Sequence, residues 1–273
     1  MFAYWTYLGF WWYFLEKRFV GDYKMLYIQP ATSLQPALVI YLIDASYSMN
    51  DPCGTTTKID MVNKALREAI KDMVRRSMRD GIVQQRYKIA IFAYSTQVID
   101  VLDGFCDLPD LVKRGFPVIS ADGETDTAAG FSAAETLLQT HLARFQASPA
   151  PLVCHLTDAL ITTGDPTPVV RRIQEMTVKD GHVLVENVYV ADKMLRSSVP
   201  DWRQWPGVSK PGQLTNRYAR LLFQLSSPLP DTYRQNINNY GYHLQKGVSL
   251  FFPGTHTELV RLAFAISTAT QLK

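Results

Sequence analysis

Cysteine and net charge are both scarce in this sequence, and each shortage excludes a class of protein. The three cysteines, Cys53, Cys106 and Cys154, are odd in number and widely spaced, without a CxxC or CxxxH arrangement. They indicate neither a disulfide framework nor a zinc site, and a reducing compartment is expected. The formal net charge is +3 over 273 residues, with no basic run interleaved with aromatics. Nucleic acid is therefore not an expected partner.

Common catalytic motifs are absent as well. The sequence has no Gly-x-Ser-x-Gly and no Gly-x-Gly-x-x-Gly, and residues 54–58 lack the second glycine and the spacing of a Walker A loop. The five histidines form no metal-spaced pair. His155, in the middle of an apolar run, is expected to be a hydrogen-bonded core residue rather than a base. These absences disfavour an enzyme.

Long hydrophobic runs are missing too, although the amino terminus is rich in aromatics. Nine of the first fourteen residues are aromatic, and Glu16-Lys17-Arg18 follows. A membrane-spanning helix needs about 20 apolar residues, and a signal peptide needs a basic start and a small-residue cleavage site. Residues 1–24 are therefore either an upstream extension of a protein that begins at Met25, or an interfacial or packing segment. We expect a cytoplasmic protein, with membrane contact only through residues 1–15.

The rest of the chain, residues 25–273, has the pattern of one α/β domain. Alternating strands and helices predict a doubly wound, mostly parallel sheet, in which residues 97–102 form one antiparallel edge strand. Residues 105–122 are expected to be irregular, and a long surface connection is expected at about 193–213. The expected strands are 38–43, 87–94, 97–102, 152–157, 182–190 and 248–252, and the expected helices are 59–79, 128–145, 167–179, 214–225, 231–240 and 257–268.

The first strand ends in a group of oxygen-bearing side chains. Residues 38–43 form an unbroken apolar run, typical of a strand buried on both faces. Asp44 follows this run directly, and Ser46 and Ser48 come two and four residues later. Mg²⁺ prefers oxygen ligands, with only one or two protein carboxylates. This stretch therefore predicts one part of a metal site.

Two later segments place oxygen ligands at the same edge of the predicted sheet. Thr125 precedes the helix expected at 128–145, and Asp158 ends the strand expected at 152–157. In doubly wound sheets, ligands bind beyond the carboxyl ends of the strands, where the strand order reverses. We expect Thr125 and Asp158 to join Asp44 at that edge.

These three segments resemble the motifs of the von Willebrand factor type A (VWA) family: Asp-Ala-Ser-Tyr-Ser at 44–48, Gly-Glu-Thr-Asp-Thr at 123–127 and Leu-Thr-Asp-Ala at 156–159. The resemblance extends from about residue 36 to the final helix and implies a Rossmann-like fold with a metal-ion-dependent adhesion site for Mg²⁺ or Mn²⁺. It implies that a carboxylate from a partner protein completes the coordination. The implied ligands are the hydroxyls of Ser46, Ser48 and Thr125 and the carboxylates of Asp44 and Asp158, bound directly or through water.

The sequence departs from the family pattern at two positions. Tyr47 replaces the common glycine between the serines, and Ala159 replaces the glycine after the last aspartate. Neither change removes a ligand, but both alter the rim of the site. We expect Tyr47, Asp126 and Leu160 to form a rim that contacts the partner, although Tyr47 can instead shield the ion and Leu160 can equally pack under the following loop.

Three interpretations remain open at this point. The first is a metal-dependent protein-interaction module, similar to intracellular bacterial VWA proteins of the tellurite-resistance-associated type, which implies a regulatory or assembly role. The second is a phosphohydrolase resembling the haloacid dehalogenases, but Ser46 stands where those enzymes have a second aspartate. The third is a VWA scaffold whose metal site is unused.

Overall fold

The computed structural model describes residues 27–158, 163–191, 194–254 and 257–267. A seven-stranded sheet lies at its centre in the order β13-β12-β9-β1-β6-β7, and β8 also pairs with β6. The sheet is parallel except for β7 and β8, which run antiparallel to β6. The predicted fold class is therefore confirmed, with β8 as a second, unexpected antiparallel strand. The strands are β1 (Ala37–Asp44), β6 (Tyr87–Tyr94), β7 (Val98–Asp100), β8 (Cys106–Asp107), β9 (Leu152–Thr157), β12 (Leu184–Tyr189) and β13 (Phe251–Pro253).

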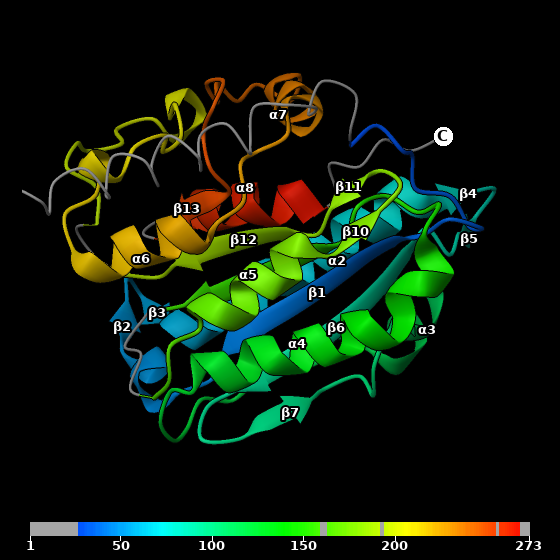
Figure 1. Cartoon of the computed structure of the whole chain (residues 1–273), viewed down its shortest axis with the longest axis horizontal. Helices are drawn as coiled ribbons and strands as arrows, with labels where there is room; N and C mark the ends of the chain where they lie inside the picture. Colours follow the sequence, from blue (N-terminus) through cyan, green and yellow to red (C-terminus); the bar gives the residue numbers. More distant parts are fainter. Residues whose placement is uncertain (1–26, 159–162, 192–193, 255–256, 268–273) are drawn as a thin grey trace, which may run out of the picture.

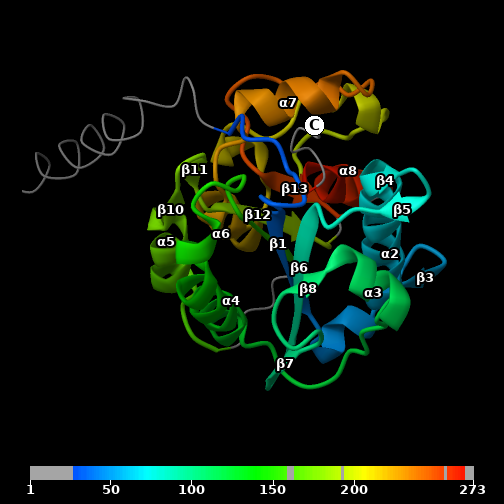
Figure 2. The same cartoon turned by 90° about the vertical axis from the view of Figure 1, so that its right-hand side faces the viewer.

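Helices cover both faces of the sheet (Figures 1 and 2), because alternate residues of each central strand point to opposite sides. All eight residues of β1 are buried. Val39 and Tyr41 belong to one apolar core and Ile40 and Leu42 to the other. Helices α4 (Thr127–His141), α5 (Thr167–Glu175) and α6 (Arg217–Leu225) lie on one side, and α2 (Lys58–Ser77) and α8 (Thr257–Ser267) lie on the other.

The strand order reverses beside β1. The chain passes from β1 to β6 on one side and later returns to β9 on the other side. The β1–β9 pairing aligns Ile43 with Leu156, so both strands end at the same edge. In such sheets this edge forms the binding crevice.

The region expected to be irregular contains the strand β8 and the helix α3 (Leu108–Arg114). Pro109 is compatible with this helix because it lies in the first turn, where the missing N–H costs no helical hydrogen bond. The prediction for residues 105–122 was therefore wrong in its first half.

Two helices end earlier than expected because short hairpins follow them. Helix α2 ends at Ser77, and β4 (Met78–Arg79) pairs with β5 (Ile82–Val83). Both residues of the intervening turn, Asp80 and Gly81, have positive φ, as a two-residue hairpin turn requires. Helix α5 likewise ends at Glu175, before the hairpin of β10 (Thr177–Val178) and β11 (Gly181–His182).

The segment between β12 and β13 packs onto the domain instead of lying only on its surface. Trp205, Val208 and Leu214 are buried in the same core as α8. The segment includes two 3-10 turns (Trp202–Gln204 and Pro211–Gln213), α6 and α7 (Asp231–Asn238). Helix α6 begins at Arg217, not at 214, because the side chain of Asn216 caps it by accepting a hydrogen bond from the Ala219 N–H.

Within the described ranges, no helix has the length and apolar character needed to cross a membrane. The extension at 1–24, and with it the segment 1–15 on which membrane contact was predicted, lies outside those ranges.

Candidate metal site

Two buried aspartates meet at the carboxyl edge of the sheet. Asp44 is the last residue of β1, and Asp158 directly follows β9. Both side chains are buried, and burial, with a smaller contribution from the charge of Asp158, raises the pKa of Asp44. Two carboxylates placed so close together in a region of low polarity favour a cation between or beside them.

Neighbouring donors fix the orientation of Asp44. Its Oδ1 accepts a hydrogen bond from the Ser46 backbone N–H at 2.9 Å, and its Oδ2 accepts one from the Thr157 hydroxyl at 2.6 Å. Burial raises the pKa of Asp44, and the hydrogen bonds from Ser46 and Thr157 oppose that shift.

The serines and the loop with Thr125 lie at the same edge. The hydroxyls of Ser46 and Ser48 are 3.3 Å apart, at the start of a 3-10 turn, Tyr47–Asn50. The 121–126 loop is attached to this turn by three hydrogen bonds, which place Thr125 here as a buried residue. They are donated by the Tyr47 N–H to the Gly123 carbonyl (2.9 Å), the Asp122 N–H to the Ala45 carbonyl (2.7 Å) and the Asn50 side chain to the Ala121 carbonyl (2.9 Å).

Glycine is required at position 123 of this loop. Gly123 has a φ of +82°, and a Cβ atom there would lie 2.6 Å from the hydroxyl oxygen of Thr96. That hydroxyl accepts a hydrogen bond from the Glu124 N–H at 2.9 Å. The close approach of the two loops therefore depends on the absence of a side chain.

The sequence did not predict that Lys58 belongs to this edge. Its Nζ donates to Asp158 Oδ2 at 2.8 Å, to Asp51 Oδ2 at 3.1 Å and to the Ser48 carbonyl at 3.2 Å. Partial burial opposes the charged form of Lys58, but the hydrogen bonds to the two aspartates outweigh it and raise its pKa. Lys58 is therefore a cation held on one oxygen of Asp158.

A buried network of hydrogen-bonded polar side chains lies next to the site. Asn187 donates from Nδ2 to the Ser226 hydroxyl at 2.9 Å and to the Leu222 carbonyl at 3.3 Å, so its Oδ1 must accept from His155 Nδ1 at 2.7 Å. Burial lowers the pKa of His155 to about 4, which leaves the ring neutral. The expectation that His155 is a hydrogen-bonded core residue is confirmed.

The orientation of the Tyr94 hydroxyl follows from this hydrogen-bond network. Neutral His155, protonated on Nδ1, can only accept at Nε2, so Tyr94 donates its hydroxyl proton there at 2.6 Å. Burial, with a contribution from the Asp44 charge, raises the pKa of Tyr94 well above the usual value.

Part of the chain that includes this edge is similar to a known family. Residues 39–160 match the family described as the von Willebrand factor type A domain. The matched range contains the Asp44, Thr125 and Asp158 segments and supports the predicted VWA family. No curated protein matches the chain.

The chain is also similar to solved structures, to different degrees. The pilus adhesin SpaC from Lactobacillus rhamnosus GG aligns over 89% of this chain and 32% of its own, with 10% identity and a TM-score of 0.52. The vWF domain of the type V pili tip protein Mfa5 from Porphyromonas gingivalis is 18% identical over 45% of this chain, with a TM-score of 0.36. The present chain spans 38% of the length of that Mfa5 structure.

The residues at the carboxyl edge of the sheet fit a hard divalent cation. Asp158 Oδ1 is buried and has no hydrogen-bond partner within the described part of the chain, so it is available as a ligand. Across the described ranges, no group of three His, Cys, Asp or Glu side chains could hold a metal. A divalent ion such as Mg²⁺ or Mn²⁺ at this edge would take much of its coordination from hydroxyls, which the Ser46–Ser48 pair and Thr125 could supply.

The structure describes two of the three predicted rim residues. The Tyr47 side chain is 69% exposed, so it extends into solvent instead of covering the serines. Asp126 is the N-cap of α4, and its carboxylate accepts from the Ala129 N–H at 2.9 Å. Leu160 lies outside the described residues.

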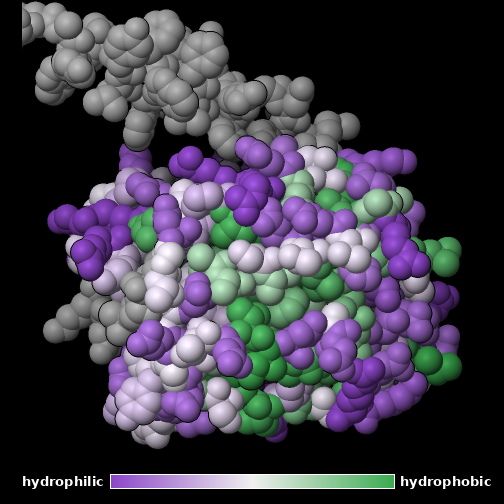
Figure 3. Space-filling view, turned by 60° about the horizontal axis from the view of Figure 1, so that its bottom comes forward, coloured by the Kyte–Doolittle hydropathy of each residue, from purple (hydrophilic) through white to green (hydrophobic). Residues whose placement is uncertain are grey.

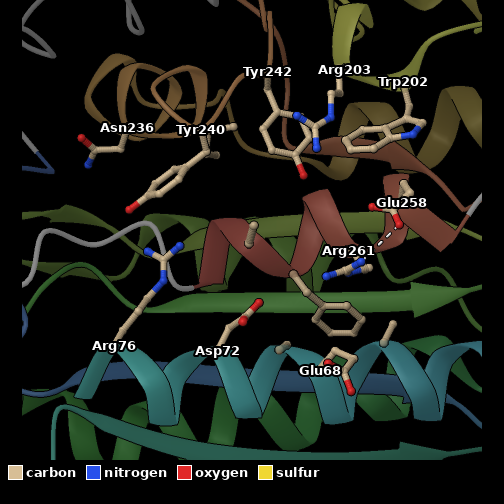
Figure 4. A pocket seen from close by; sticks show the side chains of 15 residues that line it. Glu68, Asp72, Arg76, Trp202, Arg203, Asn236, Tyr240, Tyr242, Glu258 and Arg261 are labelled. Atoms are coloured by element: carbon tan, nitrogen blue, oxygen red, sulfur yellow. Dashed lines mark hydrogen bonds and ion pairs between the residues drawn. The ribbon is translucent and has the colours of Figure 1, made fainter. Parts of the chain in front are cut away.

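A separate hollow of about 250 Å³ lies between α2, α8 and the segment before β13. Figure 4 shows Trp202 and Tyr242 on one side of it and Asp72 on the other. Its arginines and acids are similar in number, and some of them pair, as Glu258 does with Arg261. This balance of charge favours no particular ligand.

Apolar side chains also gather on one face of the domain. Figure 3 shows them in the middle of the face that is turned downward in Figure 1, where β7 and α4 lie. Apolar patches of this kind are typical of surfaces that contact other proteins.

Proposed function

We propose that this chain is a metal-dependent protein-interaction module. In this proposal Asp44, Ser46, Ser48, Thr125 and Asp158 hold Mg²⁺ or Mn²⁺, and a partner protein supplies a further carboxylate. The observation that carries the proposal is the meeting of two buried carboxylates and a hydroxyl pair at the strand-order reversal. Asp158 Oδ1 is buried there and has no hydrogen-bond partner among the described residues.

The Lewis acidity of the ion suits an anionic partner group. When bound, a divalent ion supplies that acidity and two positive charges, which two aspartates roughly neutralise. Lys58 adds one further positive charge beside Asp158, and Asp51, which pairs with Lys58, offsets it. The ion therefore keeps its Lewis acidity for an incoming carboxylate at a site whose own charges balance. Exposed Tyr47 provides an aromatic contact next to it.

The fold supports an interaction role without establishing it. SpaC, which shares the fold, is described as a pilus adhesin, but folds host many functions and the site must carry the argument. A regulatory or assembly role in the cytoplasm, as in the tellurite-resistance-associated type, belongs to the same proposal.

One observation favours a second candidate, a VWA scaffold with an unused metal site. Lys58 already places a positive charge on Asp158. The haloacid-dehalogenase-like enzyme is disfavoured, because Ser46 lies 3.3 Å from another hydroxyl, Ser48, and offers no second carboxyl group.

Calorimetric titration with Mn²⁺ tests the proposal. We expect one ion to bind the wild-type chain and Asp44→Asn to weaken that binding at least tenfold, since it removes one of two ligand charges. Asp107→Asn is the matched control, because Asp107 pairs with Lys88 at the opposite end of β6. Equal binding by wild type and Asp44→Asn would exclude the assigned site.

A pull-down with and without chelator then identifies the partner. The proposal requires that the captured protein be lost both when chelator is added and when Asp44→Asn replaces the wild type. Capture that resists both treatments would favour the scaffold interpretation.

A further inference from the structure

We propose that Lys58 is a resident counter-cation that lowers the metal affinity of this site. The inference rests on the proposed metal-binding function and concerns how that function is controlled. In this view the lysine charge stabilises the site when no metal is bound and opposes the entry of a divalent ion.

The position of Lys58 in its helix indicates a role outside the helix. Lys58 is the first residue of α2, where the positive end of the helix dipole disfavours a cation. The helix is capped independently, because the Thr57 side chain accepts from the Asp60 N–H. A lysine at this position therefore costs helix stability, and its contacts lie with the site.

Three acceptors hold the ammonium group at the site. Asp158 Oδ2, Asp51 Oδ2 and the Ser48 carbonyl all lie within 3.2 Å of Nζ, and the side chain is only 16% exposed. The backbone N–H of Lys58 also donates to the Asp51 carbonyl at 3.1 Å, which fixes the start of the helix against the loop. The charge is therefore positioned, not freely solvated.

Lys58 and a metal ion would share one carboxylate without sharing an atom. Lys58 contacts Oδ2 of Asp158, while Oδ1 is buried and has no hydrogen-bond partner in the ranges that the structure describes. The lysine thus leaves Oδ1 available as a ligand but partly neutralises the negative charge of the Asp158 carboxylate. Two cations on one carboxylate repel each other strongly where water is largely excluded, so removal of the ammonium should strengthen metal binding.

Neutral substitutions at Lys58 test the inference. Lys58→Met keeps the aliphatic stem, and Lys58→Gln keeps one hydrogen-bond donor for Asp158 in case the methionine variant folds poorly. We expect both to bind Mn²⁺ about tenfold or more tightly than wild type in calorimetric titration. Lys88→Met is the matched control, because Lys88 pairs with Asp107 at 2.8 Å away from the site. Its affinity should equal that of wild type.

The outcomes separate this inference from the proposed function. Tighter binding in both neutral variants than in wild type supports both. Binding in the neutral variants alone supports the role of Lys58 but excludes metal binding by the native chain. Binding that is equal or weaker in the neutral variants overturns the inference and leaves the function intact. Failure of all variants and wild type to bind overturns both.

Discussion

Two regions of the sheet bury a carboxyl group, and they differ in the hydrogen-bond donors that surround it. At the carboxyl edge, Asp44 receives hydrogen bonds from the Ser46 N–H and the Thr157 hydroxyl. In the middle of β12, Glu186 is equally buried, but neither of its oxygens has a hydrogen-bond partner within the described part of the chain. The weakly donating thiol of Cys154 lies beside it on β9.

The difference shows what makes a buried acid useful for binding. Burial raises the pKa of both groups, but hydrogen bonds oppose the shift at Asp44, whereas the pKa of Glu186 rises well above its usual value. Donors keep a carboxylate charged and oriented, and an environment without donors keeps it protonated. Only the carboxyl edge is therefore prepared for a cation.

The largest expected effect is the pH dependence caused by Glu186. Its carboxyl stays protonated in the folded chain but ionises near the ordinary glutamate pKa of 4.5 when the chain is unfolded. The unfolded state then binds fewer protons, so the free energy of unfolding falls by about 1.4 kcal/mol per pH unit above that value, until the folded pKa is reached. Glu186→Gln should remove this slope.

Urea unfolding of wild type and Glu186→Gln between pH 5 and pH 8 measures the effect, and the difference between the two curves isolates Glu186 from other titrating groups. Glu175→Gln serves as the control, since Glu175 is exposed on α5. Parallel curves for wild type and Glu186→Gln would contradict the assignment.

The next effect comes from removing a donor at Asp44. Thr157→Val deletes the hydroxyl at nearly constant volume and makes this carboxylate resemble Glu186. We expect a loss of about 1.5–3 kcal/mol in the free energy of unfolding at pH 7 with chelator present, the range for a hydrogen bond to a charged group. Thr157→Ser keeps the donor and should lose less. Identical losses in the two variants would show that the hydroxyl does not support Asp44.

The sequence predicted this edge because its signals are local. The apolar runs of β1 and β9 end directly at Asp44 and Asp158, so strand and ligand are adjacent in the chain. The elements that the sequence prediction missed also depend on local features. Pro109 starts α3 instead of preventing it, and the hairpin around Asp80 and Gly81 shortens α2.

The remaining parts of the site could not be predicted, since their meaning depends on distant partners. Lys58 lies 100 positions from Asp158, and only the folded loops bring the two together. Tyr94 and His155 are likewise 61 positions apart. In the sequence, Lys58 was notable only as the end of a failed Walker A match, and Tyr94 was one aromatic residue of a strand.

The smallest effect should come from Asp126, a carboxylate at the rim. Asp126→Ala removes the cap of α4 and should cost about 1 kcal/mol of unfolding free energy, while Asp126→Asn should cost only a few tenths, because asparagine caps equally well. Asn216→Ala on α6 provides a matched cap removal away from the site.

Neither Asp126 variant should change the affinity for Mn²⁺, because its carboxylate is engaged by α4. If Asp126 contacts the partner, Asp126→Asn should weaken partner capture while leaving metal titration unchanged. A drop in metal affinity would instead show that Asp126 is a metal ligand and not a rim residue.

The three thiols differ in accessibility, and this provides a chemical handle on the site. Cys106 and Cys154 are buried, whereas Cys53 is partly exposed. Cys53 lies in the short hairpin of β2 (Pro52–Cys53) and β3 (Thr56–Thr57) that leads directly into Lys58. A fluorophore attached to Cys53 in the native chain would sit five residues from the lysine, and a change in its emission on addition of Mn²⁺ would report binding at the proposed site, without any engineered cysteine.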